Sequence, residues 1–532
     1  METAGTWVSI LPPLVAILMA LVLRQVVPAL FAGIWLGAWA IHGFSLQGAW
    51  IGLLESFEKY TLESLANPDH AAIILFTFMI GGTVGVISRN GGMNGIVNHV
   101  VGWANSARRA CLTTAALGLA VFFDDYANTL VVGNAMRPVT DSMGVSRAKL
   151  AYIVDSTAAP VACIALVTTW IGYEVGLLSQ ALTLSDGLNM DAYLALIASI
   201  PYSFYPILAI IFVFMVAGSG RDFGPMRRSE QDALSLGVRP GGHLDSAMAA
   251  DCEPIDPVPN KPQRAINAVL PIAVLVLAVI AGLYITGRAK VEIADPGLKD
   301  IIGAANSYKA LLWASLLSMV TATVLSIAQR IMTLEEVVSA WYKGMRAMIY
   351  AMITLILAWA LASITAELET ADFLVSILGD SVPAQLLPFL VFVIAAFTAF
   401  ATGSSWGAMG ILVPLVVPLT WAVMVNTGHS GPSDMHLLYS SIAGVLAGCV
   451  WGDHCSPISD TTILSSMASG CDHIEHVRTQ MPYAMVVGAV SLGAGTLPVA
   501  FGLPWWGGLA LGVGLLYLVL RLAGHKANPD RV

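Results

Sequence analysis

Charged residues are scarce in this chain. Asp, Glu, Lys and Arg make up 11% of its 532 residues, whereas a soluble globular domain carries about 25%. The mean hydropathy is +0.76, and the apolar runs are long enough to cross a hydrocarbon core of about 30 Å as helices. Strands of a membrane barrel would alternate instead of running continuously apolar. The composition therefore excludes a soluble globular protein and predicts an all-α polytopic membrane protein.

Other absences narrow the class further. No basic stripe suggests nucleic-acid binding, and the net charge of −9 comes mainly from loops. The six cysteines form no C-x-x-C pair, so we expect unpaired small hydrophobic side chains. The first apolar run, 7–23, lacks a basic start and a small-residue cleavage site. It predicts a retained first span and not a signal peptide.

Several of the apolar runs are interrupted. The runs at 111–137 and 384–425 each have polar or Gly-rich residues midway and predict re-entrant helical hairpins. The runs at 148–175 and 437–468 are broken at 155–160 and 452–457. All the runs lie near 8–23, 26–42, 71–88, 111–137, 148–175, 191–217, 265–286, 308–328, 347–366, 384–425, 437–468, 482–502 and 507–522.

The placement of Lys and Arg predicts the orientation. With two hairpins that do not cross, about eleven spans put the N-terminus outside and the C-terminus inside. Basic residues such as Arg24, Arg147 and Lys149 then lie in the cytoplasm, and acids such as Glu63 and Glu174 lie in the opposite loops. The segment 287–309 departs from this rule, because it would lie outside although it carries three basic residues.

The order span, hairpin, broken span, span occurs twice with opposite orientation, which predicts inverted-topology repeats. We expect N-terminal scaffold spans at 1–70, the first repeat at 71–217 and a cytoplasmic linker at 218–264. Linking spans and an interfacial helix (332–346) follow at 265–346, the second repeat at 347–502, and a last span with a cytoplasmic tail at 503–532. Gly81 and Gly85 form a GxxxG pair that predicts close helix packing.

The polar interruptions hold the candidate site. Carboxylates at membrane depth are costly and usually line an ion path, while hydroxyls and carbonyls freed by proline suit a hard cation. Solvated helix caps, a simple proline kink and small-residue packing are the structural alternatives. The candidates for binding a cation or substrate are Asp124, Asp125, Asn128, Thr129, Asp155, Ser156, Thr157, Thr402, Gly403, Ser404, Ser405, Trp406, Asp453, His454, Ser456, Ser459, Asp460 and Thr461, with Na⁺ held by Asp124, Asn128, Asp155, Ser404 and Asp453.

The motifs FFDDYANT, ATGSSWGAMGILVP and GDHCSPISDTTILSS resemble the NhaC-type Na⁺/H⁺ antiporter family of the ion transporter superfamily. The resemblance covers nearly all of the membrane part, without the linker and the last span. It implies a two-hairpin inverted-repeat fold, a transport domain that moves against a scaffold, and a homodimer. It also implies that the hairpin tips and broken helices form the site.

Together these observations predict a secondary transporter of the inner membrane that exchanges Na⁺ for H⁺ by alternating access, of the elevator type. The alternative is a Na⁺-coupled carrier or exchanger of a small organic solute, such as an amino acid or a hydroxy acid, because relatives of this type include both. We expect no enzyme activity, since no nucleophile and base have a suitable spacing, and no cofactor besides Na⁺ as the coupling or transported ion. A zinc site at Asp453, His454, Cys455 and Asp460 lacks further ligands at a fixed spacing.

Overall fold

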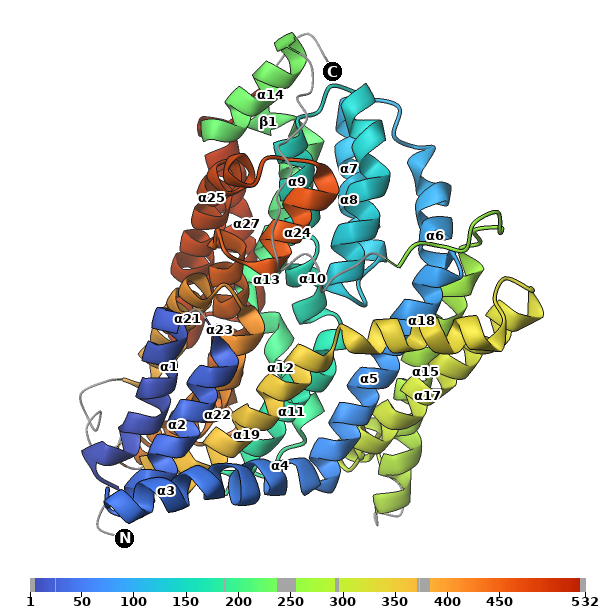
Figure 1. The fold of residues 1–532 in the computed structure, drawn as a ribbon. Helices are drawn as coiled ribbons and strands as arrows, with labels where there is room; N and C mark the ends of the chain where they lie inside the picture. Colours follow the sequence, from blue (N-terminus) through green and yellow to red (C-terminus); the bar gives the residue numbers. More distant parts are fainter. Residues whose placement is uncertain are drawn as a thin grey trace.

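The computed structural model describes residues 5–526 apart from 24, 186, 237–254, 292–295, 371–372 and 374–382. Arg24, Cys252 and the middle of the predicted linker lie outside the described residues. The described part is almost entirely helical (Figure 1). Its α-helices are α1 (Leu11–Leu23), α2 (Val26–Ile41), α3 (Leu46–Glu55), α4 (Leu62–Ala66), α5 (Pro68–Arg89), α6 (Gly92–Val101), α7 (Ala107–Ala120), α8 (Asp125–Ser142), α9 (Arg147–Ser156), α10 (Ala159–Ile164), α11 (Thr169–Thr183), α12 (Ala192–Ser199), α13 (Phe204–Ser219), α14 (Gly224–Leu236), α15 (Ile266–Lys290), α16 (Leu298–Gly303), α17 (Ser307–Ala328), α18 (Leu334–Arg346), α19 (Ile349–Glu367), α21 (Leu387–Thr402), α22 (Ser405–Asn426), α23 (Met435–Cys455), α24 (Asp460–Ser469), α25 (His473–Val490), α26 (Leu497–Ala500) and α27 (Trp505–Leu522).

Short irregular elements join these helices. Two short strands, β1 (Arg221–Asp222) and β2 (His525–Lys526), pair antiparallel and tie the C-terminal end to the end of α13. The 3₁₀ segments are Trp7–Ile10, Ile200–Tyr202 and Ala384–Leu386, and the π-helical segments are Ser56–Thr61 and Ser491–Thr496.

The number of possible membrane crossings agrees with a polytopic protein. Among the described residues, nine helices are long and apolar enough to span a bilayer, or up to eleven if each of two bent pairs is one span. The bent pairs are 147–164 with 169–183, bent by 45°, and 192–202 with 204–219, bent by 50°. The second bend was not expected from the sequence, which reads as one apolar run there.

Both predicted hairpins are present as pairs of helices joined by a turn, although α21, with the preceding 3₁₀ turn, and α22 are each long and apolar enough to span a bilayer. α7 and α8 are joined by a four-residue turn, and α21 and α22 by Gly403 and Ser404. A side chain caps the second helix of each hairpin in the same way. Asp124 accepts a hydrogen bond from the Ala127 amide at 2.7 Å, and Ser404 accepts one from the Gly407 amide at 3.2 Å. In Figure 1, α7 and α8 lie in the upper half of the molecule, whereas α22 lies in the lower half.

The predicted interfacial helix is α18. A capping box between Thr333 and Glu336 starts it, and the backbone hydrogen bond from Thr333 holds the pKa of Glu336 below its usual range. α18 crosses α5 at the predicted glycine pair: a Cβ on Gly85 would lie 2.3 Å from the carbonyl oxygen of Ala340. The predicted close packing at Gly81 and Gly85 is therefore confirmed, and its partner is α18.

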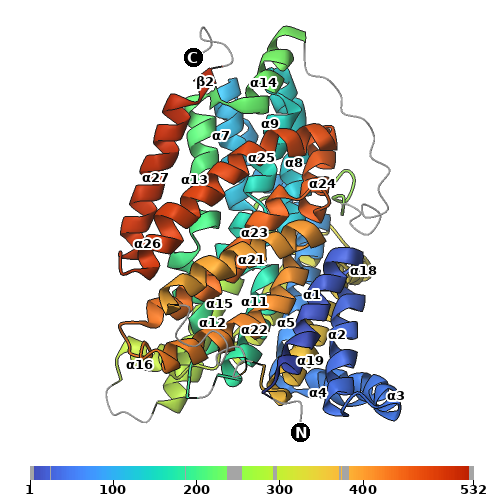
Figure 2. The same ribbon diagram turned by 90° about the vertical axis from the view of Figure 1, so that its left-hand side faces the viewer.

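The remaining packing is tight and apolar. The buried side chains of α9 to α13 and of α21, α22, α23 and α25 form one continuous core, in which α21 lies along α23. Figure 2 shows α21, α23, α24 and α25 on one face of this core and α1 and α2 beside its lower part. The five cysteines in the described part are buried and unpaired, as predicted.

Candidate functional site: four helix N-termini around a cluster of carboxylates

Four helices begin close together in the middle of the molecule. They are α8, α11, α22 and α24, each preceded by a residue whose side chain accepts a hydrogen bond from the first turn: Asp124, Thr168, Ser404 and Ser459. Hydrogen bonds connect some of these helix starts to one another. The Thr169 amide donates to the Phe123 carbonyl at 3.0 Å, and the Tyr126 hydroxyl donates to the Asp460 carboxylate.

The second hairpin completes this arrangement. Trp406 of α22 packs against Trp170 and Tyr173 of α11, with ring centroids 5.3 and 4.6 Å apart. Gly403 has φ +67°, and a Cβ there would lie 2.6 Å from the Ile458 carbonyl oxygen. The tip of the second hairpin therefore rests on the break before α24, where Ser456 also donates to the Phe400 carbonyl at 2.7 Å. Each N-terminus carries the positive end of a helix dipole.

Asn128 fixes the first hairpin against α9. Its amide nitrogen donates to the carbonyl oxygens of Gly118 at 2.7 Å and of Thr157 at 2.9 Å. Both partners only accept, so the amide oxygen must face the other way. That oxygen is buried and has no hydrogen-bond partner among the described residues.

Other side-chain oxygens near the tip of the first hairpin also lack a hydrogen-bond partner among the described residues. Asp125 Oδ2 and Thr129 Oγ1 are buried without a hydrogen-bond partner in the described part of the chain, and so is Asp453 Oδ1 at the end of α23. Asp125 and Asp453 are 2% and 0% exposed. A buried polar group without a partner costs about 1–3 kcal/mol, and such oxygens suit a hard cation such as Na⁺.

The carboxylates at α24 are bound by hydroxyl groups. Asp453 Oδ2 accepts from Thr461 Oγ1 at 2.8 Å, and Thr461 also contacts Ser459 at 3.0 Å. Asp460 accepts from the Tyr126 hydroxyl and from the Thr461 amide. The structure therefore brings Asp124 and Asp125 at the start of α8 close to Asp460 at the start of α24, with Asp453 beside them at the end of α23.

Asp155 and Ser156 lie in a different group of contacts. The Asp155 carboxylate accepts from Gln480 at 2.6 Å, Thr462 at 3.1 Å and Ser465 at 3.2 Å. Ser156 contacts His454 Nε2 at 3.0 Å, and His454 Nδ1 contacts the Tyr205 hydroxyl at 2.6 Å. With three donors on its two oxygens, Asp155 has no unpartnered oxygen.

The remaining candidates have structural contacts. Thr157 and Thr402 bond back to carbonyls of their own helices, Ile153 and Thr398, at 2.8 and 2.9 Å. Ser405 is buried in the first turn of α22.

The first broken span differs from the prediction. The helix is interrupted between Ser156 and Ala159 as expected, but the 45° bend lies further along, at the four residues 165–168 between α10 and α11. In chain order, the break at 165–168 is the counterpart of 456–459, so Thr168 and Thr169 correspond to Ser459 and Asp460. The sequence prediction did not include these threonines, because it ended the break at Pro160. In both repeats the break follows the hairpin at an equivalent place in the chain, and this symmetry could have revealed Thr168 and Thr169.

The prediction that Glu174 lies in a loop opposite the cytoplasmic side is wrong. It lies inside α11, is 1% exposed, and its carboxylate contacts the Cys163 thiol. Hydropathy alone assigns a lone acid near the end of an apolar run to a loop. In the structure, α11 begins after the bend and continues past Glu174, so this acid lies inside the protein.

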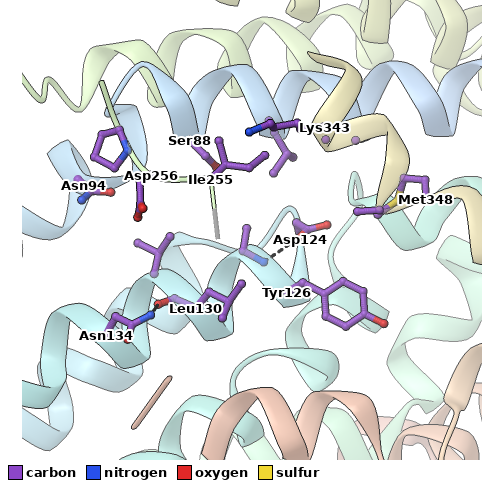
Figure 3. Close-up of a pocket in the computed structure, with 18 of the residues that line it drawn as sticks. Ser88, Asn94, Asp124, Tyr126, Leu130, Asn134, Ile255, Asp256, Lys343 and Met348 are labelled. Atoms are coloured by element: carbon purple, nitrogen blue, oxygen red, sulfur yellow. Dashed lines mark hydrogen bonds between the residues drawn. The ribbon is translucent and has the colours of Figure 1, made fainter. Parts of the chain in front are cut away.

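A cavity of about 340 Å³ reaches this site (Figure 3). Asp124 and Tyr126 lie on one side, and Lys343 and Met348 lie across from them on the segment of α18 and its end. Residues 255–257, from the end of the linker, line its outer part. Arg89 holds them by donating to the Asp256 carbonyl at 2.8 Å.

These features define a multi-pass helical membrane transporter with two helical hairpins and two broken helices around a central polar site. The sequence pattern of the Na⁺/H⁺ antiporter family matches residues 161–495, and the chain belongs to that family. The predicted NhaC-type resemblance is thereby confirmed.

Relatives by sequence agree with this family. An uncharacterized protein of Haemophilus influenzae is 32% identical over 94% of this chain and 92% of its own length. Shorter matches are the arginine/ornithine antiporter ArcD of Halobacterium salinarum, 34% identical over 21% of this chain and 20% of its own, and the malate-2H⁺/Na⁺-lactate antiporter of Bacillus subtilis, 32% identical over 17% of each.

Two solved structures share the fold. The YdaH transporter of Alcanivorax borkumensis superposes with a TM-score of 0.53 at 15% identity, covering 90% of both chains. MtrF of Neisseria gonorrhoeae gives 0.51 at 12% identity, covering 89% of this chain and 85% of its own. At this identity the likeness concerns the fold alone.

Proposed function

We propose that this protein is a Na⁺/H⁺ antiporter whose cation site lies at the tip of the first hairpin and the start of α11. One observation carries the proposal: Asp125, Asn128 and Thr129 each have a buried side-chain oxygen without a hydrogen-bond partner in the described part of the chain. Asn128 in particular is oriented by two carbonyls so that only its oxygen is free.

The physical chemistry of a buried carboxylate favours exchange. Burying an ionised carboxylate without a counter-charge costs several kcal/mol, so Asp125 is stable with either a cation or a proton bound. Na⁺ binding therefore displaces a proton, and proton binding displaces Na⁺. Asp453, with one free oxygen at the symmetric broken helix, is the second candidate for a cation ligand.

Alternating access would come from movement of one part of the molecule past another. The cavity lies between α5 and α18 on one side and α8 on the other, which suits an elevator in which the two hairpins and broken helices move along a scaffold that includes α5 and α18. The inner membrane location, the N-terminus outside, the cytoplasmic C-terminus and a homodimer belong to the same proposal.

The test uses proteoliposomes with an internal pH dye and Na⁺ added outside, with no other solute. We expect Na⁺ alone to change the internal pH and Asp125→Asn to abolish this change. Glu58→Gln, which alters an exposed acid outside the site, should leave it intact. Absence of any Na⁺-driven pH change in the wild-type protein would refute the antiporter.

A second function has one observation in its favour. Lys343 lines the same cavity as Asp124 at the N-terminus of α8, so the site offers positive groups to an organic carboxylate. Relatives named for exchange of arginine and ornithine or of malate and lactate are consistent with such a solute. If Na⁺ alone drives nothing, the same vesicles should respond when amino acids or hydroxy acids are added with Na⁺.

A further inference from the structure

A second cavity lies between α4, α5, α11 and α19, at the end of the molecule opposite to α14. Its volume is about 290 Å³. Figure 1 shows α4 and the adjoining end of α5 at the bottom of the molecule, with α14 at the top. The cavity shares no lining residue with the cavity beside Asp124. Its walls are mostly polar and include Glu63, Asp69, His70, Ser179, Gln180 and Ser363.

Gln180 brings an oxygen without a partner to this wall. Its amide nitrogen donates to the Trp359 carbonyl oxygen at 2.7 Å and to Ser363 Oγ at 2.9 Å. A carbonyl oxygen only accepts, so the nitrogen and not the oxygen of this amide faces α19. Gln180 is 9% exposed, and its Oε1 has no hydrogen-bond partner among the described residues. This oxygen therefore gains from a donor group that enters the cavity.

The charged groups of the cavity have one sign. Glu63 of α4 and Asp69 of α5 are exposed acids, and the described residues that line the cavity include no Lys or Arg. His70 donates from Nδ1 to the Ser64 carbonyl oxygen at 2.7 Å, and its ring stacks on Trp359 with the centroids 3.6 Å apart. Nε2 of the neutral ring then only accepts. The lining therefore favours a cation that carries hydrogen-bond donors.

The size of the cavity selects among cations. Its volume is near the lower end of the range for small-molecule pockets, about 300–1,000 Å³, and is far larger than a bare metal ion. The described part of the chain also contains no group of three His, Cys, Asp or Glu side chains that could hold a metal ion. A guanidinium or primary ammonium ion with a short carbon chain suits this volume and supplies both the charge and the N–H groups.

We propose that this cavity binds a small organic cation with N–H groups, of the guanidinium or primary ammonium class, at a site separate from the proposed Na⁺ site. The N–H groups donate to Gln180 Oε1, and the positive charge faces Asp69 and Glu63. Gln180 lies about 17 Å along α11 from Thr169, near the centre of the molecule. Because the bound ion joins α5 to α11, it restrains the movement of α11 along the scaffold. This restraint rests on the proposed function, whereas the binding itself does not.

Binding is measured as a rise in the thermal midpoint of the purified full-length protein in detergent. Methylguanidinium chloride is the probe. Tetramethylammonium chloride, which has the charge but no N–H group, and urea, which has N–H groups but no charge, are the controls. We expect a saturable rise with methylguanidinium alone. No saturable rise, or an equal rise with tetramethylammonium, would overturn the site.

Variants locate the bound ion. Gln180→Leu should weaken binding about tenfold or more, because it removes an acceptor from a charged donor. Asp69→Asn, at an exposed acid, should weaken binding about two- to fivefold. Gln47→Leu, at an exposed position on α3, should bind as the wild-type protein does. Wild-type affinity in both Gln180→Leu and Asp69→Asn would overturn the proposal, and so would a loss of binding that occurs only in Asp125→Asn.

The effect on transport is measured in the proteoliposomes with the pH dye. Methylguanidinium should slow the Na⁺-driven pH change of the wild-type protein, and it should slow that of Asp69→Asn less at the same concentration. If Na⁺ alone drives no pH change, the proposed function fails, while the measurement in detergent still decides the binding site. Binding in detergent without any slowing of transport would overturn the restraint on α11.

Discussion

At the scale of single residues, Asn128 is held between two carbonyl oxygens and presents its own oxygen to the proposed cation site. Asn128→Asp would place a carboxylate oxygen against these two acceptors and leave both without a donor, at a cost of about 1–3 kcal/mol for each buried group. We expect a lower thermal midpoint and loss of the Na⁺-dependent stabilisation, measured by thermal unfolding in detergent with and without Na⁺.

Asn134 on the same helix provides the matched control. Its amide makes one hydrogen bond, to the Leu130 carbonyl, and is exposed. Asn134→Asp should change the midpoint little and keep the response to Na⁺. Equal behaviour of the two variants would remove the special role assigned to Asn128.

At the scale of elements, the second hairpin depends on a glycine at its tip. Gly403 has φ +67°, and a side chain there meets the Ile458 carbonyl at 2.6 Å. Gly428, at the other end of α22, has φ +76° but nothing within 4 Å of an added Cβ. The left-handed backbone costs about 1–2 kcal/mol for alanine at either position.

Comparing alanine at Gly403 with alanine at Gly428 therefore separates the effect of the Ile458 contact from the effect of the left-handed backbone. Gly403→Ala should separate the hairpin tip from the break before α24 and abolish Na⁺-driven pH change in proteoliposomes. Gly428→Ala should lower stability alone and keep transport. Transport by Gly403→Ala at the rate of Gly428→Ala would show that the close approach is not needed.

The elements themselves could largely be predicted, because hydropathy, glycine and proline act locally. The hairpin at 111–137 and the break after Cys455 follow from residues within a few positions of each. The bend before Thr169 could not be found in this way, since its sequence contains no proline or glycine. A contact distant in the sequence helps to hold it, since the Phe123 carbonyl accepts a hydrogen bond from the Thr169 amide.

At the scale of the whole molecule, a buried ion pair joins three separate helices. Lys149 Nζ of α9 lies 2.7 Å from Asp222 Oδ2 after α13 and 3.7 Å from Glu230 Oε2 of α14, and Tyr483 of α25 donates to Asp222 at 3.0 Å. Lys149→Met would leave Asp222 buried without its cation, and we expect a loss of about 3–5 kcal/mol in the free energy of unfolding.

Denaturant unfolding in detergent measures this loss. Lys309→Met, at an exposed position, is the control and should be near neutral. The double variant with Asp222→Asn should recover part of the stability, because it removes the unpaired charge. A single variant as stable as wild type would mean that this pair does not hold the helices together.

The sequence by itself determined the membrane class, the two hairpins, the two polar breaks and the acids at their tips. Each follows from residues adjacent in the chain. Only the tertiary structure decided which oxygens stay unpartnered: among the described residues, Asp125 and Asn128 keep a side-chain oxygen without a partner, whereas Gln480, 325 positions away, helps to saturate Asp155. Hydrogen-bond capacity is used up by neighbours in space, and pattern along the chain does not record those neighbours.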